Sequence, residues 1–435
     1  MLRRDWLLRT LGGMGGALAT PKEAVPAAKH LLDGFTDVIN VAMYGARGDG
    51  VTDDHRAVQL ALDDAAKRPT GGVVTFPSGV YALGAPLRVQ SRVTILALGS
   101  FPRYARYPNA PTLPVTLRST KGFPRESPLL DVRRASYTHV EGVEILGDGS
   151  PGPDQTDGTT TGIAYGTAGQ SSTGSLWSGH MVRNCSIVGH RYGVHAKDAS
   201  YHWWEFTNVA VCWAAGVFFE AWCGDSTLVG MYANRCNAHL QADADPSVGY
   251  GVFLGNGTSN VNMIGGKVEN NGRGLQITES CGVNVVGVSF HNNGHYHVGL
   301  RGGAHAATSV QLSGCRLLGG GLALAGRGGA HLRLETSVNA RAGLTASGCS
   351  FKAGSQATAL DYDPAGPRGP DHVAWASGRG SVTLLLTGSD CADACTLGKT
   401  AAVHFERGLR ADSTCVAGSN LGDLGFEILD GKLKQ

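Results

Sequence analysis

Short apolar runs separated by turn residues are the main pattern of this chain from about residue 128 onward. The residues between the runs are mostly Gly, Asn and Asp, which favour tight turns, so we interpret the runs as short strands. Val261-Asn262 recurs as Val283-Asn284, and Asn270-Asn271-Gly272 recurs as Asn292-Asn293-Gly294, in both cases 22 residues later. A repeat of this length accommodates three strands and three turns, and it predicts a solenoid whose coils bury their apolar side chains against one another.

An opening unit over residues 38–100 has a different pattern. A short apolar run at 38–41 is followed by a Gly- and Asp-rich turn, and apolar residues then recur at helical spacing from Ala57 to Ala65. Thr52 and Asp53 stand where side-chain oxygens are needed to accept the free N–H groups of a first helical turn. The opening unit is therefore predicted to be strand, capped helix, strand, turn and strand.

Two runs of this unit carry a family resemblance: Tyr44-Gly-Ala-Arg-Gly-Asp-Gly-Val-Thr-Asp-Asp54 and Gly71-Gly-Val-Val-Thr-Phe-Pro-Ser-Gly-Val-Tyr81. They resemble the N-terminal signature of the pectate-lyase/polygalacturonase superfamily. The resemblance implies an all-β fold, a right-handed parallel β-helix with an N-terminal capping α-helix. It also implies an activity among those of polysaccharide hydrolases, lyases, uronate epimerases and tailspike depolymerases.

The motifs of two better-defined branches of that superfamily are absent. The Asn-Thr-Asp, Gly-His-Gly and Arg-Ile-Lys motifs of polygalacturonases do not occur, and Asp53-Asp54 belongs to the helix cap. The Asp-Pro-His-Glu motif of alginate epimerases is also missing, because Asp363-Pro364 is followed by Ala365-Gly366. We therefore expect neither pectin galacturonan hydrolysis nor that type of epimerisation.

The first twenty residues have the pattern of an export signal. Arg3 and Arg4 precede a weakly apolar segment that ends in small residues, which resembles a twin-arginine signal and predicts a periplasmic or secreted protein. An amphipathic N-terminal arm is the alternative. No run of 18 or more apolar residues follows, so no membrane span is expected. The predicted organisation is signal 1–20, linker 21–37, N-terminal cap 38–100, β-helix coils with loop excursions 101–380, and C-terminal coils and cap 381–435.

Composition narrows the classes of possible partner and cofactor. Glycine makes up 64 of 435 residues without a collagen period, which suits many tight turns. A net charge of +2 gives no case for a nucleic-acid partner. No His/Cys set has zinc-site spacing, so no metal site is predicted. Asp243 and Asp245 form a plain turn, join the acidic cluster or bind calcium. Cys391 and Cys395 are the close pair that a disulfide would join, whereas the remaining cysteines sit singly in apolar runs as small buried residues, for example Cys185, Cys212, Cys281, Cys315 and Cys349.

Alternation along the predicted strands divides their residues into inward and outward columns. The column expected inside is Val194, Val217, Val252, Leu275 and Val298. The first outward column is His195, Phe218, Phe253, Gln276 and Gly299, and the second is Lys197, Glu220, Gly255, Thr278 and Arg301. Such a mixture of aromatic, cationic and acidic side chains suits a sugar polymer; the alternative is an ordinary solvated sheet.

The densest stretch of candidate chemistry is Tyr201-His-Trp-Trp-Glu205 followed by Glu220-Ala-Trp-Cys-Gly-Asp225. Glu205 and Asp225 are 20 residues apart, close to one coil, and are proposed as a catalytic carboxylate pair with Glu220 next in line. The predicted substrate-binding residues are Trp203, Trp204 and Phe218 as a sugar platform, with His195, Lys197 and Arg301.

The leading hypothesis is a glycoside hydrolase acting on an extracellular polysaccharide without a cofactor other than the calcium left open above. The first alternative is a polysaccharide lyase or uronate epimerase, in which His195, Lys197 or Arg301 removes a proton beside a uronate carboxylate. The second is a non-catalytic polysaccharide-binding or structural β-helix. The oligomeric state is left open between monomer and homotrimer.

Overall fold

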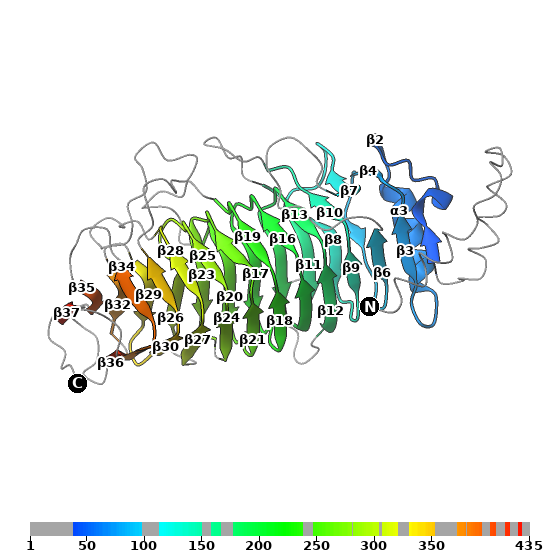
Figure 1. Cartoon of the computed structure of the whole chain (residues 1–435). Coiled ribbons are helices and arrows are strands. Elements are labelled where there is room, and N and C mark those ends of the chain that lie inside the picture. Colours follow the sequence, from blue (N-terminus) through cyan, green and yellow to red (C-terminus); the bar gives the residue numbers. More distant parts are fainter. Residues whose placement is uncertain are drawn as a thin grey trace, which may run out of the picture.

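The computed structural model describes residues 38–97, 113–149, 158–166, 177–237, 247–280, 282–303, 307–320, 330–352, 372–379, 381–393, 401–405, 414–417 and 425–428. Three parallel sheets run the length of the molecule, with 13 strands in sheet A and 12 each in sheets B and C. From β3 to β36 the described chain passes from sheet to sheet in the order A, B, C, and each strand pairs with the strand three elements away in the next coil; at the two ends β1 pairs with β3, β2 with β4 and β35 with β37. The result is a right-handed parallel β-helix, drawn in Figure 1 as a column coloured from blue to red.

Sheet A consists of β1 (Val38–Asn40), β3 (Val73–Phe76), β6 (Thr94–Ala97), β9 (His139–Glu141), β12 (Trp177–Arg183), β15 (Ala199–Glu205), β18 (Ser226–Val229), β21 (Val261–Ile264), β24 (Val283–Val286), β27 (Thr308–Ser313), β30 (Arg341–Ser347), β33 (Ser381–Thr387) and β36 (Thr414–Ala417). Sheet B consists of β2 (Asp49–Asp53), β4 (Gly79–Leu83), β7 (Val115–Ser119), β10 (Glu144–Leu146), β13 (Ser186–Val188), β16 (Asn208–Ala210), β19 (Tyr232–Asn234), β22 (Lys267–Glu269), β25 (Ser289–His291), β28 (Arg316–Leu318), β31 (Ser350–Lys352) and β34 (Asp390–Asp393). Sheet C consists of β5 (Leu87–Arg88), β8 (Pro128–Arg133), β11 (Thr161–Gly166), β14 (Tyr192–Lys197), β17 (Ala215–Ala221), β20 (Tyr250–Asn256), β23 (Arg273–Thr278), β26 (Val298–Gly302), β29 (Ala330–Thr336), β32 (His372–Gly378), β35 (Ala401–Phe405) and β37 (Gly425–Ile428).

The helix α3 (His55–Ala66) lies at the N-terminal end of the column, after the short 3-10 helix η1 (Val41–Tyr44) (Figure 1). The N-cap of α3 is Asp54, one residue after the predicted Asp53, and its side chain makes no capping hydrogen bond. Asp53 accepts a hydrogen bond from the backbone N–H of His55 at 3.0 Å. The expectation for Thr52 was wrong, because its hydroxyl donates to Asp49 within β2. The buried Asp54 carboxylate accepts the backbone N–H groups of Arg47 and Gly48, so it fixes the preceding turn against the helix.

The inward column predicted for the coils is confirmed. Val194, Val217, Val252, Leu275 and Val298 are in register across sheet C, and all are 0% exposed. The 22-residue repeat is also visible in the pairing of Asn262 with Asn284, whose side chains are joined by a hydrogen bond of 3.1 Å. The core is therefore a continuous stack of apolar layers, in which each coil depends on its neighbours.

Six cysteines of the described residues are buried and unpaired by disulfides: Cys185, Cys212, Cys223, Cys236, Cys315 and Cys349. The predicted export signal and linker lie outside the described residues, as do Cys281, Cys395, Asp243, Asp245 and Asp363-Pro364; the side chain of Cys391 is likewise not described. Within the described residues, no helix is long and apolar enough to cross a membrane.

Candidate functional site

The predicted site residues divide between two faces of the column. His195 and Lys197 lie on β14 of sheet C, whereas Trp203 and Glu205 lie on β15 of sheet A. The chain turns between these strands at Asp198, which has a left-handed φ of 52°. Residues that are close in sequence are therefore directed onto different sheets, and they do not form one site.

Sheet C carries a compact group of three charged or titratable side chains. Glu220 Oε2 lies 2.7 Å from His195 Nε2, and Glu220 Oε1 lies 2.7 Å from Lys197 Nζ. All three side chains are partly exposed, at 30% for His195, 26% for Lys197 and 34% for Glu220. The carboxylate thus bridges a histidine and a lysine at a solvent-accessible surface.

A β-bulge puts Glu220 in this position. Ala196 pairs with Phe219, but Lys197 pairs with Ala221, so Glu220 is the additional residue in β17. A bulge re-aims the side chain of its additional residue, and here it directs the carboxylate between His195 and Lys197. The predicted alignment of Lys197 with Glu220 in one straight column was therefore wrong by one residue, although the two side chains meet. On the next strand, a Cβ at Gly255 would come within 2.1 Å of the Glu220 carbonyl oxygen, which explains the glycine there.

The electrostatics of this group fix its charges at neutral pH. The hydrogen bond from His195, supported by that from Lys197, lowers the pKa of Glu220 to about 2 against the opposing effect of burial. The hydrogen bond to Glu220 in turn raises the pKa of Lys197. Glu220 is therefore ionised and Lys197 protonated.

Aromatic rings surround the imidazole. The Tyr192 and Phe218 rings stack at 5.0 Å, the His195 and Phe218 rings lie 5.1 Å apart, and Phe253 meets Phe218 edge-on at 5.1 Å. The predicted outward column from His195 through Phe218 and Phe253 is confirmed by the register of the strands. These rings limit the rotation of His195 and present apolar surface beside it.

Sheet A corrects the remaining predictions for the tryptophans. Trp204 is 0% exposed and packs against His202 and Phe219, so it belongs to the core and is unable to form a sugar platform. Trp203 is 44% exposed and donates its indole N–H to Glu205 at 2.8 Å. Strand alternation decides this difference, since adjacent residues point to opposite sides of a sheet.

The proposed carboxylate pair is not assembled. Glu205 is in register with Val229, four residues beyond Asp225 along β18, which corresponds to a separation on the order of 10 Å. Glu205 instead bonds Arg183 at 3.0 Å, whereas Asp225 accepts a hydrogen bond from the Asn260 side chain. The expectation that Glu205 and Asp225 lie side by side is therefore wrong, although the catalytic role of each residue remains an untested prediction.

Arg301 lies on sheet C, but four strands from β14 in the order of the sheet. At about 4.8 Å per strand this is roughly 19 Å from the rung of Lys197. The Arg301 guanidinium pairs with Glu335 at 3.1 Å and has no contact with the His195 group.

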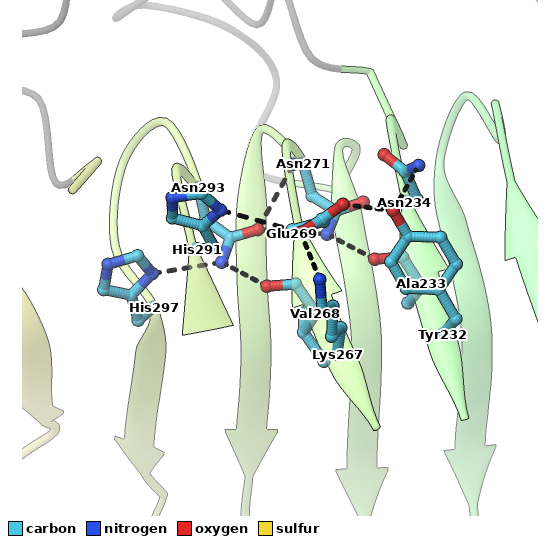
Figure 2. Close-up of polar contacts among 10 residues, drawn as sticks. All are labelled: Tyr232, Ala233, Asn234, Lys267, Val268, Glu269, Asn271, His291, Asn293 and His297. Carbon is cyan, nitrogen blue, oxygen red and sulfur yellow. Dashed lines mark hydrogen bonds and ion pairs between the residues drawn. The ribbon is translucent and has the colours of Figure 1, made fainter. Parts of the chain in front are cut away.

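A second polar cluster, on the outward face of sheet B, was missed as a group by the sequence analysis. Figure 2 shows Glu269 at its centre, where the carboxylate accepts a hydrogen bond from the Tyr232 hydroxyl. Lys267 Nζ and His291 Nδ1 lie 3.8 and 3.6 Å from Glu269 Oε2, and Asn234 donates to the Tyr232 hydroxyl. The 22-residue repeat contains a signal for this cluster, because it aligns Glu269 with His291.

The contacts of Glu269 indicate a structural role. Its side chain is only 12% exposed, and burial raises its pKa, but hydrogen bonds from His291 and Tyr232 more than offset this effect and leave the pKa lowered. Both carboxylate oxygens are engaged by neighbouring strands. The Glu220 group, with an exposed histidine at its edge, is therefore the better candidate for chemistry.

The described part of the chain contains no assembled set of metal ligands. No three His, Cys, Asp or Glu side chains among the described residues are placed to hold an ion together. The calcium alternative at Asp243 and Asp245 remains a prediction.

Comparison with known families agrees with this geometry. Residues 38–99 match the family model for rhamnogalacturonase A/epimerase, pectate lyase-like, and residues 168–357 match that for the right handed beta helix region. The chain is a right-handed parallel β-helix protein, and its opening unit is similar to pectate-lyase-like proteins. The first match covers the opening unit that carried the resemblance, and the second covers the coils that bear His195, Lys197 and Glu220.

Solved structures share the fold of this β-helix protein at low sequence identity. Tailspike protein 2 of an Escherichia coli O157:H7 bacteriophage is similar over 80% of this chain and 42% of its own, with a TM-score of 0.54 and 14% identity. The A-module of the mannuronan C-5 epimerase AlgE4 from Azotobacter vinelandii is similar over 88% of this chain and 100% of its own, with a TM-score of 0.50 and 14% identity.

Curated relatives match over short segments of this β-helix protein. Plasmin and fibronectin-binding protein A of Streptococcus pneumoniae is 44% identical over 61 residues, which is 14% of this chain and 8% of the relative. The tail spike protein of Shigella phage Sf6 is 31% identical over 91 residues, 20% of this chain and 15% of the relative. The chain thus spans only 8% and 15% of the length of these two relatives, and matches this short identify no particular reaction.

Proposed function

We propose that this protein is an exported polysaccharide-active enzyme that removes the proton beside a uronate carboxylate, as a lyase or an epimerase. The observation that carries the proposal is the bridge from the Glu220 carboxylate to His195 and Lys197, both at 2.7 Å, on an exposed face of sheet C. The likeness in fold to a mannuronan epimerase and to tailspikes supports a polysaccharide as the partner.

His195 is the proposed general base. An ionised carboxylate only accepts hydrogen bonds, so the imidazole nitrogen that faces Glu220, Nε2, carries a proton. In the neutral ring, Nδ1 then holds the free lone pair, and this atom makes no hydrogen bond with the described part of the chain. Glu220 therefore orients the base and stabilises the imidazolium that forms when Nδ1 accepts the substrate proton.

Lys197 supplies the positive charge that the reaction requires. When the proton beside the carboxylate leaves, its electron pair delocalises onto the carboxylate oxygens, and a fixed ammonium beside them stabilises that charge. In a lyase the pair then forms a C=C bond as the bond to the neighbouring glycosidic oxygen breaks, and that oxygen takes up a proton. In an epimerase, a proton returns to the same carbon from the opposite face.

Hydrolysis, the reaction first expected from the sequence, has less support in this geometry. It requires a carboxylic acid that is protonated near neutral pH together with a second carboxylate. Glu220 is ionised down to a pH of about 2, and Asp131, two rungs from His195 in its outward column, is held at 2.7 Å by Arg133 through each of its oxygens. The geometry therefore favours the lyase or epimerase alternative.

The test is a screen of the purified protein against a panel of uronate polysaccharides with three readouts. Ultraviolet absorbance detects the new C=C bond of a lyase, deuterium uptake from D₂O at the carbon beside the carboxylate detects an epimerase, and reducing ends without absorbance indicate hydrolysis. His195→Ala is expected to abolish the first two signals, whereas His291→Ala, which removes an outward histidine of sheet B, is expected to preserve them. Reducing ends alone would overturn the proposal in favour of a hydrolase that uses Glu205, Asp225 or Glu220, and silence in every channel would favour the binding-protein alternative.

Export and assembly are part of the same proposal. N-terminal sequencing of protein recovered from outside the cytoplasm tests the signal predicted at residues 1–20. Sedimentation of the purified chain distinguishes the monomer from the homotrimer.

A further inference from the structure

An open pocket of about 810 Å³ is lined by the segment that follows α3, by β5 and the turn after it, and by the end of β8 and the turn after it. Five arginines line it: Arg68, Arg88, Arg92, Arg133 and Arg134. Asp131 is the acidic residue of its lining. The pocket is therefore strongly cationic in a chain whose formal net charge is only +2.

Three of these cations are engaged within the protein. Arg133 holds the Asp131 carboxylate through two bonds of 2.7 Å, Arg68 lies 3.9 Å from Asp64, and Arg92 donates to the carbonyl of Pro69. Gln59 and Gln90 donate hydrogen bonds to Asp63 Oδ1. The acidic residue of the pocket lining, Asp131, is thus already paired with Arg133.

Arg88 and Arg134 have no acidic partner in the part of the chain that the structure describes, and both are exposed. Arg88 is in register with Asp131, yet the Asp131 carboxylate is taken by Arg133, so the Arg88 guanidinium faces the pocket without a counter-charge. A guanidinium presents a planar pair of N–H groups that matches carboxylate, sulfate and phosphate oxygens. The structure therefore leaves two such forks available to a bound anion.

The size and lining of the pocket favour an organic ligand that carries an anionic group over a free ion. A volume of about 810 Å³ is within the range of pockets that hold organic ligands of several rings. The Tyr137 side chain, 64% exposed, adds an aromatic face of the kind on which a sugar ring stacks. Its backbone has a left-handed φ of 58°, and its ring packs against the backbone of Gly179, where a Cβ would come within 2.6 Å.

The pocket continues the outward column of sheet C. Arg88, Asp131, Ala164 and His195 are successive partners in register, so the Asp131 rung lies two rungs, roughly 10 Å, from His195. We infer that this pocket binds the anionic groups of an acidic oligosaccharide, with Arg88 and Arg134 on a carboxylate or sulfate and Tyr137 on a sugar ring. The site does not depend on the reaction proposed for His195, because binding alone defines it.

Calorimetric titration of the full chain tests this inference, with trigalacturonate and a heparin-derived sulfated tetrasaccharide as probes. Arg88→Gln/Arg134→Gln is expected to weaken binding of at least one probe by about tenfold or more, as the loss of two charge-assisted forks predicts. The matched control is Arg316→Gln/Arg341→Gln, which removes two exposed arginines elsewhere on the column and is expected to change binding less than about twofold. Tyr137→Ala is expected to weaken the binding of the oligosaccharide probes but not the binding of inorganic sulfate.

Several results would overturn the inference. Equal loss in the control double variant would mean that net charge alone is responsible, and equal binding of the trigalacturonate methyl ester would exclude anion recognition. If sulfate binding depends on Arg88 and Arg134 but Tyr137→Ala has no effect on oligosaccharide binding, the pocket binds free oxyanions and not an oligosaccharide. The proposed binding site would also be refuted if binding disappears in His195→Gln but persists in Arg88→Gln/Arg134→Gln. It would likewise be refuted if neither probe binds. Because the readout is binding, an inactive His195 variant that still binds would separate failure of the proposed reaction from failure of this site.

Discussion

Lowering the pH from 7 to 5 is expected to destabilise the β-helix through histidines buried in its interior. His180 and His190 are 1% and 0% exposed, and burial lowers the pKa of each to about 4. In the unfolded chain both revert to the ordinary value near 6.5, so between pH 6.5 and pH 4 the unfolded state binds protons that the folded state excludes. The folded state is therefore favoured fully above pH 6.5 and loses stability as the pH falls toward 4.

The magnitude follows from the two pKa values. Each unit of pKa difference is worth about 1.4 kcal/mol, so at pH 5 each histidine costs about 2 kcal/mol and the two together cost about 4 kcal/mol. Burial also holds the pKa values of His202 and His297 well below 6.5, which adds to the loss. The carboxylates with lowered pKa, Glu220 among them, lose their contribution only below pH ~4.5, so the interval from pH 7 to 5 isolates the histidines.

The assay is urea unfolding at pH 7, 6 and 5, compared between wild type and His180→Phe. Phenylalanine preserves an aromatic ring beside Tyr165, 4.6 Å away, and His202, 5.1 Å away, but does not titrate. It leaves the Thr138 hydroxyl without its 2.9 Å bond to Nδ1, a cost of roughly 1–3 kcal/mol that is the same at every pH. The fall in unfolding free energy between pH 7 and 5 is therefore expected to shrink by about 2 kcal/mol. Tyr165→Phe, a change in the same cluster, is expected to leave that fall unchanged, and an equal fall in His180→Phe and wild type would refute the reasoning.

Three further predictions follow from single contacts. Glu220→Gln should lower turnover about a hundredfold, because it removes the charge that orients His195. Glu269→Gln on sheet B should leave turnover unchanged. Both effects are measured by steady-state kinetics on the polysaccharide that the protein acts on. Trp204→Ala should cost about 3–5 kcal/mol in urea unfolding because it empties part of the core, whereas Trp203→Ala should cost less than about 1 kcal/mol. Asn293→Ala should lower the free energy of unfolding by about 2–4 kcal/mol, because Asn271 loses its hydrogen-bond acceptor and the Val268 carbonyl loses its donor. An equal loss in Asn284→Ala, where the asparagine is half-buried, would contradict this account.

The Asn293 contacts also show why the solenoid was readable from the sequence. Asn271 and Asn293, both 0% exposed, stack in successive coils and join their side chains at 3.0 Å, as Figure 2 shows. Two successive coils bury an amide at the same turn position, so the same residue recurs after 22 residues and the repeat records the stacking directly. The inward valines are repeated for the same reason, and alternation then places His195 and Phe218 outside.

The candidate site was only partly predictable because its decisive features leave no periodic signal. Alternation correctly placed His195, Lys197 and Phe218 on one outward face, since it depends only on strand geometry. The turn at Asp198 and the additional residue in β17 break that periodicity, and neither has a distinctive residue type. The bulge shifts the partner of Lys197 from Glu220 to Ala221, and the register that pairs Glu205 with Val229 separates Glu205 from Asp225; the 20-residue spacing reveals neither.

The same two irregularities give the site its chemistry. Without the bulge, strand alternation would pair Lys197 with Glu220 across adjacent rungs, but nothing would direct the carboxylate between Lys197 and His195. With the bulge, one carboxylate accepts hydrogen bonds from both His195 and Lys197 at 2.7 Å, so it holds one nitrogen of the neutral imidazole protonated and leaves the other free. A regular solenoid supplies a rigid, repetitive surface, and a local departure from the repeat is what distinguishes one rung from its neighbours. In this protein the search for function is therefore best directed to the positions where the repeat fails.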